Sequence, residues 1–586
     1  MKAKPSRARV AAAAKSPKKT GTPKKPKWAK FHTEMVSEFP SPFRGGKDPL
    51  AREIEKFVEK LDRLRPKPGG PAYLGRNGAA LTFTYPEVKD AKINREMGDL
   101  DAVLDEVVKL FDGAPHWGSP LTMCNVIPQA NTAAIVASML AQVFAANILE
   151  GEYAWNVHRA ELESAGMLAN LFGWDPLKAG GLYTWGGSGC WTYGVKYGLT
   201  RVLPDSRRKG VRTDAKVICS QQAHYVKENA TDWMGLGMDN IVPVRTDDQT
   251  NQMDLAHLEE ILKDFTARKI PVATVVCTMG TTDANAIDPI GKVRQLMDRY
   301  PNPPGFGKAV LYADAVVGWS WIYFKDYDFK KNPLEFSERI LPVLRENGRA
   351  MKELEHADAV GIDFHKVGWA PYVSSCFVYK NAGEFESIHR RGGDAYLQVR
   401  TNYNPMYYTL EVSRTASGSL AGWATLKYFG MEGMQSILGG ILETKYYLYD
   451  LISRLPDFAL ANADDSGLTT LFRVYPEGMD AQAQFNKELI EPASRAELIE
   501  HNQLTEAVGN KLFEWFRAGK KIDGKYTPYM SFTTGFRNAD YNRDGKDAEA
   551  VIYALKSFPM NVFVTPETME WMLHCVRAAR DAVLKK

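Results

Sequence analysis

Short runs rich in β-branched residues alternate with amphipathic helical patterns through the middle of this 586-residue chain. Between the runs lie segments such as Asp254–Lys269, whose apolar residues recur at the spacing of an amphipathic helix. Strand, helix and strand in this order predict a mostly parallel sheet with helices on both faces. The strand-like runs are Lys216–Ser220, Asn240–Val244, Val272–Thr278, Ala309–Ala315 and Cys376–Lys380.

The first 30 residues differ sharply from the rest of the chain. They carry eleven Lys and Arg, no Asp or Glu, and are low in complexity. Such a segment buries too little apolar surface to offset its ordering entropy, so we predict that it is disordered. A solvated tail, a tether to nucleic acid or a membrane surface, and a transit peptide all fit this composition. The remaining residues hold 63 of the 74 basic side chains against 70 acidic ones, so the folded body gives no indication of nucleic-acid binding.

The rest of the chain divides by pattern into three parts. Residues 31–115 contain amphipathic helical segments, and Asp48 with Pro49 forms a good helix start. Residues 116–415 hold the alternating pattern, and residues 416–586 combine helices with short strands. We therefore predict an N-terminal helical segment, a large α/β domain and a smaller α+β domain.

Cysteine usage and hydropathy predict a protein of a reducing, cytoplasmic compartment. None of the six cysteines forms a C-x-x-C pair, so neither disulfides nor structural zinc are expected. No apolar segment opens the chain, so no secretory signal is expected. The apolar stretch Thr132–Leu149 includes small residues, Gln142 and Asn147, and we predict a buried core helix rather than a membrane span. A calcium-like segment at Asp540 lacks the glutamate at its twelfth position, so no metal site is predicted.

A glycine cluster opens one of the predicted helices. It consists of Gly186, Gly187 and Gly189, with Ser188 between them. Exposed N–H groups at a helix start, together with the Ser188 hydroxyl, suit an anionic phosphate. A tight turn without a ligand would also explain the glycines. The pattern is neither a G-x-x-x-x-G-K-[ST] loop nor a dinucleotide fingerprint.

Three further polar side chains follow predicted strands, namely His224, Asp314 and Lys366. In open α/β sheets, ligands bind at the carboxyl ends of the strands. A lone histidine is often structural, and a carboxylate at the end of an apolar strand must be paired or hydrogen-bonded. With the glycine cluster, however, these residues match the needs of pyridoxal phosphate. Lys366 would form the Schiff base, Asp314 would pair with the ring nitrogen, and His224 would lie over the ring face.

The order of these motifs resembles the group II pyridoxal-phosphate-dependent amino-acid decarboxylases. The resemblance runs from about His116 to Phe429, and Asp363 and Tyr372 flank the lysine as in the microbial tyrosine-decarboxylase branch. It implies pyridoxal-phosphate fold type I, with a mostly parallel sheet of the seven-stranded type, helices on both faces and a smaller α+β C-terminal domain. Five segments carry it: TWGGSG, SQQAH, CTMGTTDANAIDPI, YADAVVG and DFHKVGWAPY.

The resemblance also implies roles for individual residues. His365 would contact the phosphate, and Thr281 would line the pocket with Thr282. Ser413 and its neighbour Arg414 would reach the site of a second subunit, because family members are usually homodimers with shared active sites. Residues 31–113 would wrap the partner. The residues placed at the cofactor are Gly187, Ser188, Gly189, His224, Thr281, Asp314, His365, Lys366 and Ser413.

The chain departs from the family pattern at several positions. Tyr312 replaces a histidine, and Val316 replaces an alanine and would crowd the ring's second face, so we expect an unusual substrate. The segment WNVHRAELE replaces polar residues expected upstream, which puts the substrate contacts in doubt. Residues 325–356 look like an insertion that would form a lid or a dimer element.

These observations predict an enzyme that removes CO2 from an L-amino acid, and the tyrosine-branch resemblance favours an aromatic or large apolar substrate. The tyrosine-rich segment 390–411 follows two glycines, as a lid would. Two alternatives stay open: a carbon–carbon lyase or aminotransferase on the same fold, and an inactive scaffold that keeps it. Candidate tyrosines for the proton donor to the α-carbon are Tyr372, Tyr396, Tyr403, Tyr407 and Tyr408.

Overall fold

The computed structural model describes residue 29 and residues 35–42, 48–77, 85–212, 214–247, 250–392, 401–462 and 466–585. The predicted disordered tail, apart from residue 29, lies outside the described residues, as does Tyr396. The chain forms two compact units, Met1–Arg63 and Leu64–Lys586. Helix α2 (Pro49–Leu64), all but its last residue in the first unit, begins as predicted after Asp48, whose Oδ1 accepts the N–H of Leu50 at 2.9 Å.

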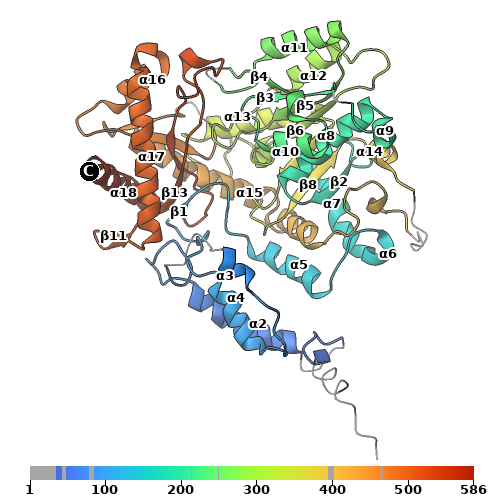
Figure 1. The fold of residues 1–586 in the computed structure, drawn as a ribbon, viewed down its shortest axis with the longest axis horizontal. Coiled ribbons are helices and arrows are strands. Elements are labelled where there is room, and N and C mark those ends of the chain that lie inside the picture. Colours follow the sequence, from blue (N-terminus) through green and yellow to red (C-terminus); the bar gives the residue numbers. More distant parts are fainter. Residues whose placement is uncertain are drawn as a thin grey trace, which may run out of the picture. The chain divides into compact units, whose positions relative to one another are not determined.

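A seven-stranded sheet forms the centre of the second unit (Figure 1). Its strand order is β2-β8-β7-β6-β5-β3-β4. Strand β8 runs antiparallel to both of its neighbours, while the pairs among β3 to β7 are parallel. The predicted mostly parallel seven-stranded sheet is therefore confirmed. The strands are β2 (Gly180–Thr184), β3 (Lys216–Ser220), β4 (Ile241–Val244), β5 (Val272–Thr278), β6 (Val310–Asp314), β7 (Ala359–Asp363) and β8 (Ser375–Tyr379).

Alternate side chains of each strand enter two separate hydrophobic cores. Val275 and Leu311 belong to the core shared with α7, α11, α12, α13 and α15, whereas Val276 and Tyr312 belong to the core shared with α8 and α10. Because successive side chains of a strand point to opposite faces, apolar residues lie on both faces of the sheet, and helices cover both of them. The helices are α7 (His158–Leu171), α8 (Gly187–Val202), α10 (Val226–Trp233), α11 (Leu255–Arg268), α12 (Ile290–Arg299), α13 (Leu341–Lys352), α14 (Ala382–His389) and α15 (Ser417–Ile452).

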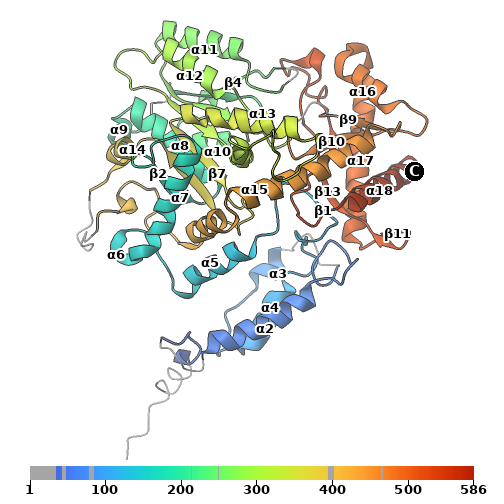
Figure 2. The same ribbon diagram turned by 180° about the vertical axis from the view of Figure 1, so that it is seen from behind.

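The predicted α+β part is built on a five-stranded sheet in the order β1-β13-β14-β10-β9 (Figure 2). Strand β1 (Thr122–Met123) comes from far upstream and pairs in parallel with β13. Helix α15 begins at Ser417 and is interrupted at Gly430, which has non-helical backbone angles. The other elements are β9 (Phe458–Leu460), β10 (Thr470–Val474), β13 (Tyr529–Thr533), β14 (Ala554–Ser557), α16 (Ala481–Ile490), α17 (Arg495–Arg517), α18 (Pro566–Leu584) and the hairpin β11 (Lys521–Ile522) and β12 (Lys525–Tyr526).

The apolar stretch after Asn131 forms helix α5 (Thr132–Val143), but this helix is not a buried core helix as predicted. Ala134 and Ala141 are its only buried residues, while Leu140 is 55% exposed and Phe144, just beyond the helix, is 75% exposed. Small residues face the protein because they allow close packing, and the larger ones point outward. Among the described helices, none is both long enough and apolar enough to cross a membrane. Other short helices are α3 (Tyr85–Lys89), α4 (Leu100–Lys109), α6 (Gly151–Ala154) and α9 (Ser206–Lys209).

The segment 325–356, predicted to be a lid or a dimer element, contributes buried residues to the core through helix α13, although many of its other residues are exposed. Leu344 and Met351 of α13 are fully buried in the same core as strands β5 to β7. Gly348 packs so closely on the backbone of Phe324 that an added Cβ would lie 2.7 Å from the Phe324 carbonyl carbon. We conclude that α13 is a covering helix of the sheet rather than a lid.

Candidate active site

The polar residues of the predicted site gather at one edge of the seven-stranded sheet. Asp314 is the last residue of β6 and Asp363 is the last residue of β7. The antiparallel strand β8 begins at this edge, so Ser375 lies opposite Asp363. Parallel strands bring their carboxyl ends together, and the sheet thus positions these side chains.

Lys366 follows β7 after a short turn and forms an ion pair with Asp363. Its Nζ lies 2.8 Å from Asp363 Oδ2, and the Ser375 hydroxyl donates a 2.6 Å hydrogen bond to Asp363 Oδ1. Burial alone would lower the pKa of Lys366, but Asp363 outweighs burial, with further contributions from Asp314 and Tyr372, and the pKa is raised. Lys366 is therefore held as an ammonium in this arrangement.

Asp363, predicted only as a marker of the tyrosine-decarboxylase branch, lies at the centre of this cluster. Its side chain is fully buried and contacts the predicted catalytic lysine directly. A carboxylate that ends a buried strand and lies three residues before a lysine was the available signal. That spacing does not show whether the two side chains turn toward each other.

Asp314 is buried at the end of β6 and is held by a tryptophan. The indole Nε1–H of Trp191, in α8, donates a 2.6 Å hydrogen bond to Asp314 Oδ2. Burial raises the pKa of Asp314, while the hydrogen bond from Trp191 and the charge of Lys366 act in the opposite direction. Trp191 was not predicted from the sequence, because an aromatic residue inside a helix equally fits a role in the core.

The glycine cluster forms the turn between β2 and α8. Gly186 has a φ of 109°, which favours glycine, and α8 begins at Gly187. A Cβ on Gly187 would lie 3.2 Å from Asp363 Oδ2 and from Val316 Cγ1, and a Cβ on Gly189 would lie 2.0 Å from the Thr184 hydroxyl. The absence of side chains here leaves the first N–H groups of α8 accessible beside Asp363.

His224 follows β3, and its ring is neutral at physiological pH. Burial and the positive charge of Lys366 lower the pKa of His224 to about 4, although the residue as a whole is exposed to solvent. Its Nδ1 accepts the N–H of Val226 at 3.1 Å. A neutral imidazole near the lysine is the form that can cover an aromatic cofactor ring without adding a second positive charge.

His365 is buried, and both nitrogens of its ring have neighbours within the protein. Its Nδ1 lies 3.0 Å from the carbonyl oxygen of Ser374, and its Nε2 lies 3.4 Å from Asp363 Oδ2. The ring of Tyr372 lies 4.1 Å away, centroid to centroid. Burial lowers the pKa of His365, which favours the neutral imidazole.

The observations on three other predicted site residues do not connect them to Lys366. Thr281 uses its hydroxyl to accept the N–H of Ala286 at 3.0 Å within its own loop. Ser413 is exposed on the surface. Tyr408 is buried, and its electrostatic neighbours are Glu386 and Glu161 rather than the residues around Lys366.

Two other candidates, Arg414 and Tyr403, are tied to Glu161 inside the chain. The Arg414 guanidinium forms a buried ion pair with Glu161 and donates to the Tyr183 carbonyl at 3.0 Å. The Tyr403 hydroxyl donates to Glu161 Oε1 at 2.9 Å. Glu161 belongs to the unusual WNVHRAELE segment, which therefore holds the segment around Arg414 rather than facing Lys366.

The two departures noted in the YADAVVG segment have different environments. Tyr312 is fully buried in the core beneath α8, where a Cβ on Gly361 would lie 2.3 Å from its hydroxyl. It therefore packs inside the protein. Val316, by contrast, lies beside Gly187 and narrows the space in front of Asp363.

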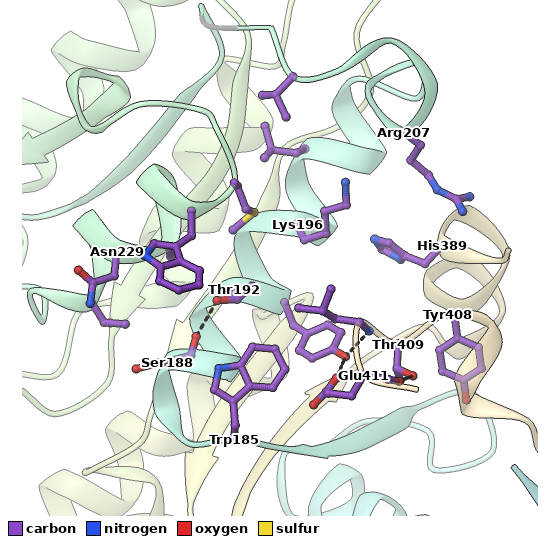
Figure 3. A pocket seen from close by; sticks show the side chains of 18 of the residues that line it. Trp185, Ser188, Thr192, Lys196, Arg207, Asn229, His389, Tyr408, Thr409 and Glu411 are labelled. Carbon is purple, nitrogen blue, oxygen red and sulfur yellow. Dashed lines mark hydrogen bonds between the residues drawn. The ribbon is translucent and has the colours of Figure 1, made fainter. Parts of the chain in front are cut away.

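A cavity of about 880 Å³ lies next to the glycine loop (Figure 3). Ser188, Thr192 and Lys196 line it from one face of α8, and Tyr408 faces it from another segment. Trp185, beside the glycine loop, also lines this cavity. The Ser188 side chain faces this cavity, which leaves its backbone N–H as the group available at the start of α8.

The residues at the sheet edge fit pyridoxal phosphate. A lysine amine suits its aldehyde, a buried carboxylate suits its ring nitrogen, and a helix start without side chains suits its phosphate. Val316 and the ion pair of Lys366 with Asp363 are close to that helix start. The fold and the site thus define the class of α/β proteins that bind this cofactor through a lysine.

Comparison with known proteins identifies the family to which the chain belongs. The model of the pyridoxal-dependent decarboxylase conserved domain matches residues 85–318 and 340–474. The chain therefore belongs to the pyridoxal-dependent decarboxylase family, which confirms the predicted family and cofactor. The unmatched residues 319–339 overlap the start of the predicted insertion.

Individual relatives agree with this family and differ in substrate. An L-2,4-diaminobutyrate decarboxylase of Acinetobacter baumannii is 27% identical over 280 residues, which cover 46% of this chain and 49% of the relative. An L-tyrosine decarboxylase of Enterococcus faecalis is 27% identical over 279 residues, 44% of each chain. The chain thus spans about half the length of these curated relatives. The solved apo structure of mouse CSAD shares the fold, with a TM-score of 0.70 and 16% identity over 91% of this chain and 99% of that one.

Proposed function

We propose that this chain catalyses the pyridoxal-phosphate-dependent α-decarboxylation of an L-amino acid, giving the amine and CO2. The observation that carries the proposal is the placement of Lys366 beside Asp363, with Asp314 at the end of the neighbouring strand. Both relatives are named decarboxylases, which supports this reaction over carbon–carbon cleavage or amino transfer on the same fold.

Each residue at the sheet edge has a defined task in this reaction. Pyridoxal phosphate, when bound, supplies the electron sink for the pair of electrons that CO2 leaves behind. Lys366 would hold it covalently, and Asp314, oriented by Trp191, would keep a proton on the ring nitrogen. The first N–H groups of α8 would bind the phosphate, and neutral His224 would cover one face of the ring.

Tyr372 is our proposed proton donor to the α-carbon. It is 56% exposed, so a substrate can reach it, and it packs against His365 beside Lys366. Burial of part of its side chain raises the pKa of Tyr372, so the phenol keeps its proton at neutral pH. Replacing it with Phe should lower kcat by about 10²–10⁴-fold, the usual contribution of a general acid.

We propose an aromatic or large apolar side chain for the substrate. Trp185, Tyr372 and Val373 are each more than a third exposed near the glycine loop, and a Cβ on Gly186 would lie 3.8 Å from Val373 Cγ1. These three side chains carry no charge, which favours an apolar group over a charged one. The L-tyrosine decarboxylase relative supports this choice.

A second copy of the chain completes the proposed enzyme as a homodimer. Helix α4 has no buried residue, and its Val103 and Val107 are each 44% exposed. Helix α5 exposes Leu140, and Phe144 follows it. Apolar faces of this kind are typical of subunit interfaces. A Leu140→Lys variant should shift the mass measured by light scattering toward the monomer, whereas Leu177→Lys, at a 94% exposed position, should not.

The cysteines support a reducing, cytoplasmic setting. All six are buried free thiols. Burial raises the pKa of Cys219 and Cys575 to about 12, so these thiols are unreactive at neutral pH. Fractionation of cells with an antibody to the protein would test the proposed compartment.

The reaction itself is tested by a screen for CO2 release from each amino acid with added cofactor. Release from aromatic or large apolar amino acids, lost in Lys366→Ala, is the expected result. Formation of a keto acid without CO2 would contradict decarboxylation. A purified protein that shows no lysine-dependent visible absorbance with the cofactor would support an inactive scaffold instead.

A further inference from the structure

The Asp363 carboxylate lies at the start of helix α8. A Cβ on Gly187 would be 3.2 Å from its Oδ2 and 3.5 Å from its Oδ1. The carboxylate is fully buried, so water screens its charge weakly. The start of a helix attracts anions, and the carboxylate lies beside the first residue of α8.

The same carboxylate also holds Lys366. The two groups are 2.8 Å apart, and the Ser375 hydroxyl fixes the other carboxylate oxygen at 2.6 Å. Asp314 and Tyr372 also favour the charged form of Lys366, while burial opposes it. His224 and His365 are nearby, and their lowered pKa values leave them neutral, so they do not compete with Lys366 for a proton.

We propose that Asp363 restrains the loading of pyridoxal phosphate by holding Lys366 as an ammonium and by placing a negative charge at the phosphate-binding start of α8. This inference rests on the proposed function, because it assumes that Lys366 and α8 receive the cofactor. Loading then requires two changes at Asp363: its ion pair with Lys366 breaks, and a phosphate comes close to its carboxylate.

The covalent step explains why the lysine charge matters. The Lys366 ammonium first loses a proton to solvent, because only the free amine has a lone pair. The amine would add to the aldehyde carbon of the cofactor. The aldehyde oxygen would then leave as water with the two amine protons, so that a C=N bond replaces the C=O bond. No oxidant or reductant is needed. Any group that favours the ammonium slows this step.

The variant Asp363→Asn tests the proposal directly. It keeps the shape of the side chain and an oxygen for the Ser375 hydroxyl, and it removes the charge. We expect the variant to bind the cofactor more tightly and to load it about tenfold faster at pH 7, which corresponds to a fall of one unit in the pKa of Lys366. Loading is followed by visible absorbance and by borohydride trapping with mass spectrometry of the Lys366 peptide.

Asp314→Asn is the matched control, since it replaces another buried carboxylate that favours the charged lysine. This variant loses the carboxylate proposed to pair with the ring nitrogen of the cofactor. We therefore expect weaker cofactor binding, the opposite of the result expected for Asp363→Asn. Slower or weaker loading in Asp363→Asn would overturn the proposal. If the wild type forms no trapped Lys366 adduct, the proposed function fails rather than this inference alone.

Phosphate and pH provide measurements that do not depend on activity. In the Lys366→Ala background, inorganic phosphate should raise the Tm more when Asp363 is also replaced with Asn, because the repulsion is gone. An equal shift in both proteins would contradict the predicted repulsion. If Asp363→Asn does not fold, the wild type still tests the lysine: its loading rate should rise about tenfold per pH unit from pH 6 to 8, and a flat rate would overturn the proposal.

Discussion

The indole N–H of Trp191 donates a 2.6 Å hydrogen bond to Oδ2 of Asp314, and both side chains are buried. This contact joins helix α8 to the end of strand β6, residues that are 123 positions apart in the sequence. It ties the helix that begins at the glycine loop to the carboxylate proposed to face the cofactor ring. The phosphate end and the ring end of the site are thereby held in a fixed relation.

Trp191→Phe should weaken cofactor binding. An aromatic ring remains, but the indole N–H that donates to the Asp314 carboxylate is lost. The pKa of Asp314 should therefore rise further. A hydrogen bond to a charged group contributes about 1.5–3 kcal/mol, so we expect the Kd for pyridoxal phosphate to rise about 10- to 100-fold in an absorbance titration. Trp185→Phe, at a 41% exposed position, is the control and should leave Kd unchanged. Equal Kd values for Trp191→Phe and the wild type would contradict a positioning role.

Gly361→Ala should destabilise the fold by about 1–3 kcal/mol through overpacking. The added methyl would lie 2.3 Å from the Tyr312 hydroxyl and 2.7 Å from Cys190 Cβ. Tyr312→Phe in the same background should recover part of the loss, because it removes the first of these contacts. Gly166→Ala, in helix α7 with no atom within 4 Å of the added Cβ, should be neutral or slightly stabilising in urea unfolding. Equal effects at Gly361 and Gly166 would argue against close packing on Tyr312.

Asp288 should make the folded state less stable as the pH rises from 4 to 7. Burial raises the pKa of Asp288 to about 7, although its oxygens accept the N–H groups of Met253 and Thr278 at 2.7 Å each. Between the unfolded value near 4 and this folded value, the native state binds more protons, so stability is present at low pH and is lost toward pH 7. The linked change is roughly 4 kcal/mol.

The corresponding measurement is urea unfolding of wild type and Asp288→Asn at several pH values. The variant has no carboxyl group at this position, so its stability should change less between pH 4 and 7 than that of the wild type. The comparison uses the slope of the free energy of unfolding against pH. A change in hydrogen bonding that shifts stability equally at every pH does not affect this slope. Identical slopes would show that Asp288 does not titrate in this range.

Glu161→Gln should cost about 3–5 kcal/mol, because it leaves the buried Arg414 without its charged partner. Glu163→Gln, two residues along the same helix and paired with exposed Arg159, should change the urea midpoint little. If Arg414 instead acted mainly at a second subunit, Glu161→Gln would leave the stability of the monomer unchanged.

Much of the site was predictable because parallel strands end at a common edge. Asp314 and Lys366 each follow an apolar run, and the fold brings them to that edge as expected. His224 also lies near Lys366, as the change in its pKa indicates. Tyr408 and Ser413 could not be placed in this way. They follow irregular segments, whose course depends on long-range packing rather than on a repeating pattern.

The sequence by itself determined the architecture and the order of the chemical groups, because hydrophobic periodicity and turn residues act locally along the chain. Only the tertiary structure decided which groups meet. It paired Asp363 with Lys366, joined Trp191 to Asp314 and enclosed Arg414 with Glu161. It also left α5 half exposed, against the prediction from its composition. The physical reason is the same in each case: a side chain's charge and burial depend on the neighbours that packing brings to it, and these come from distant parts of the chain.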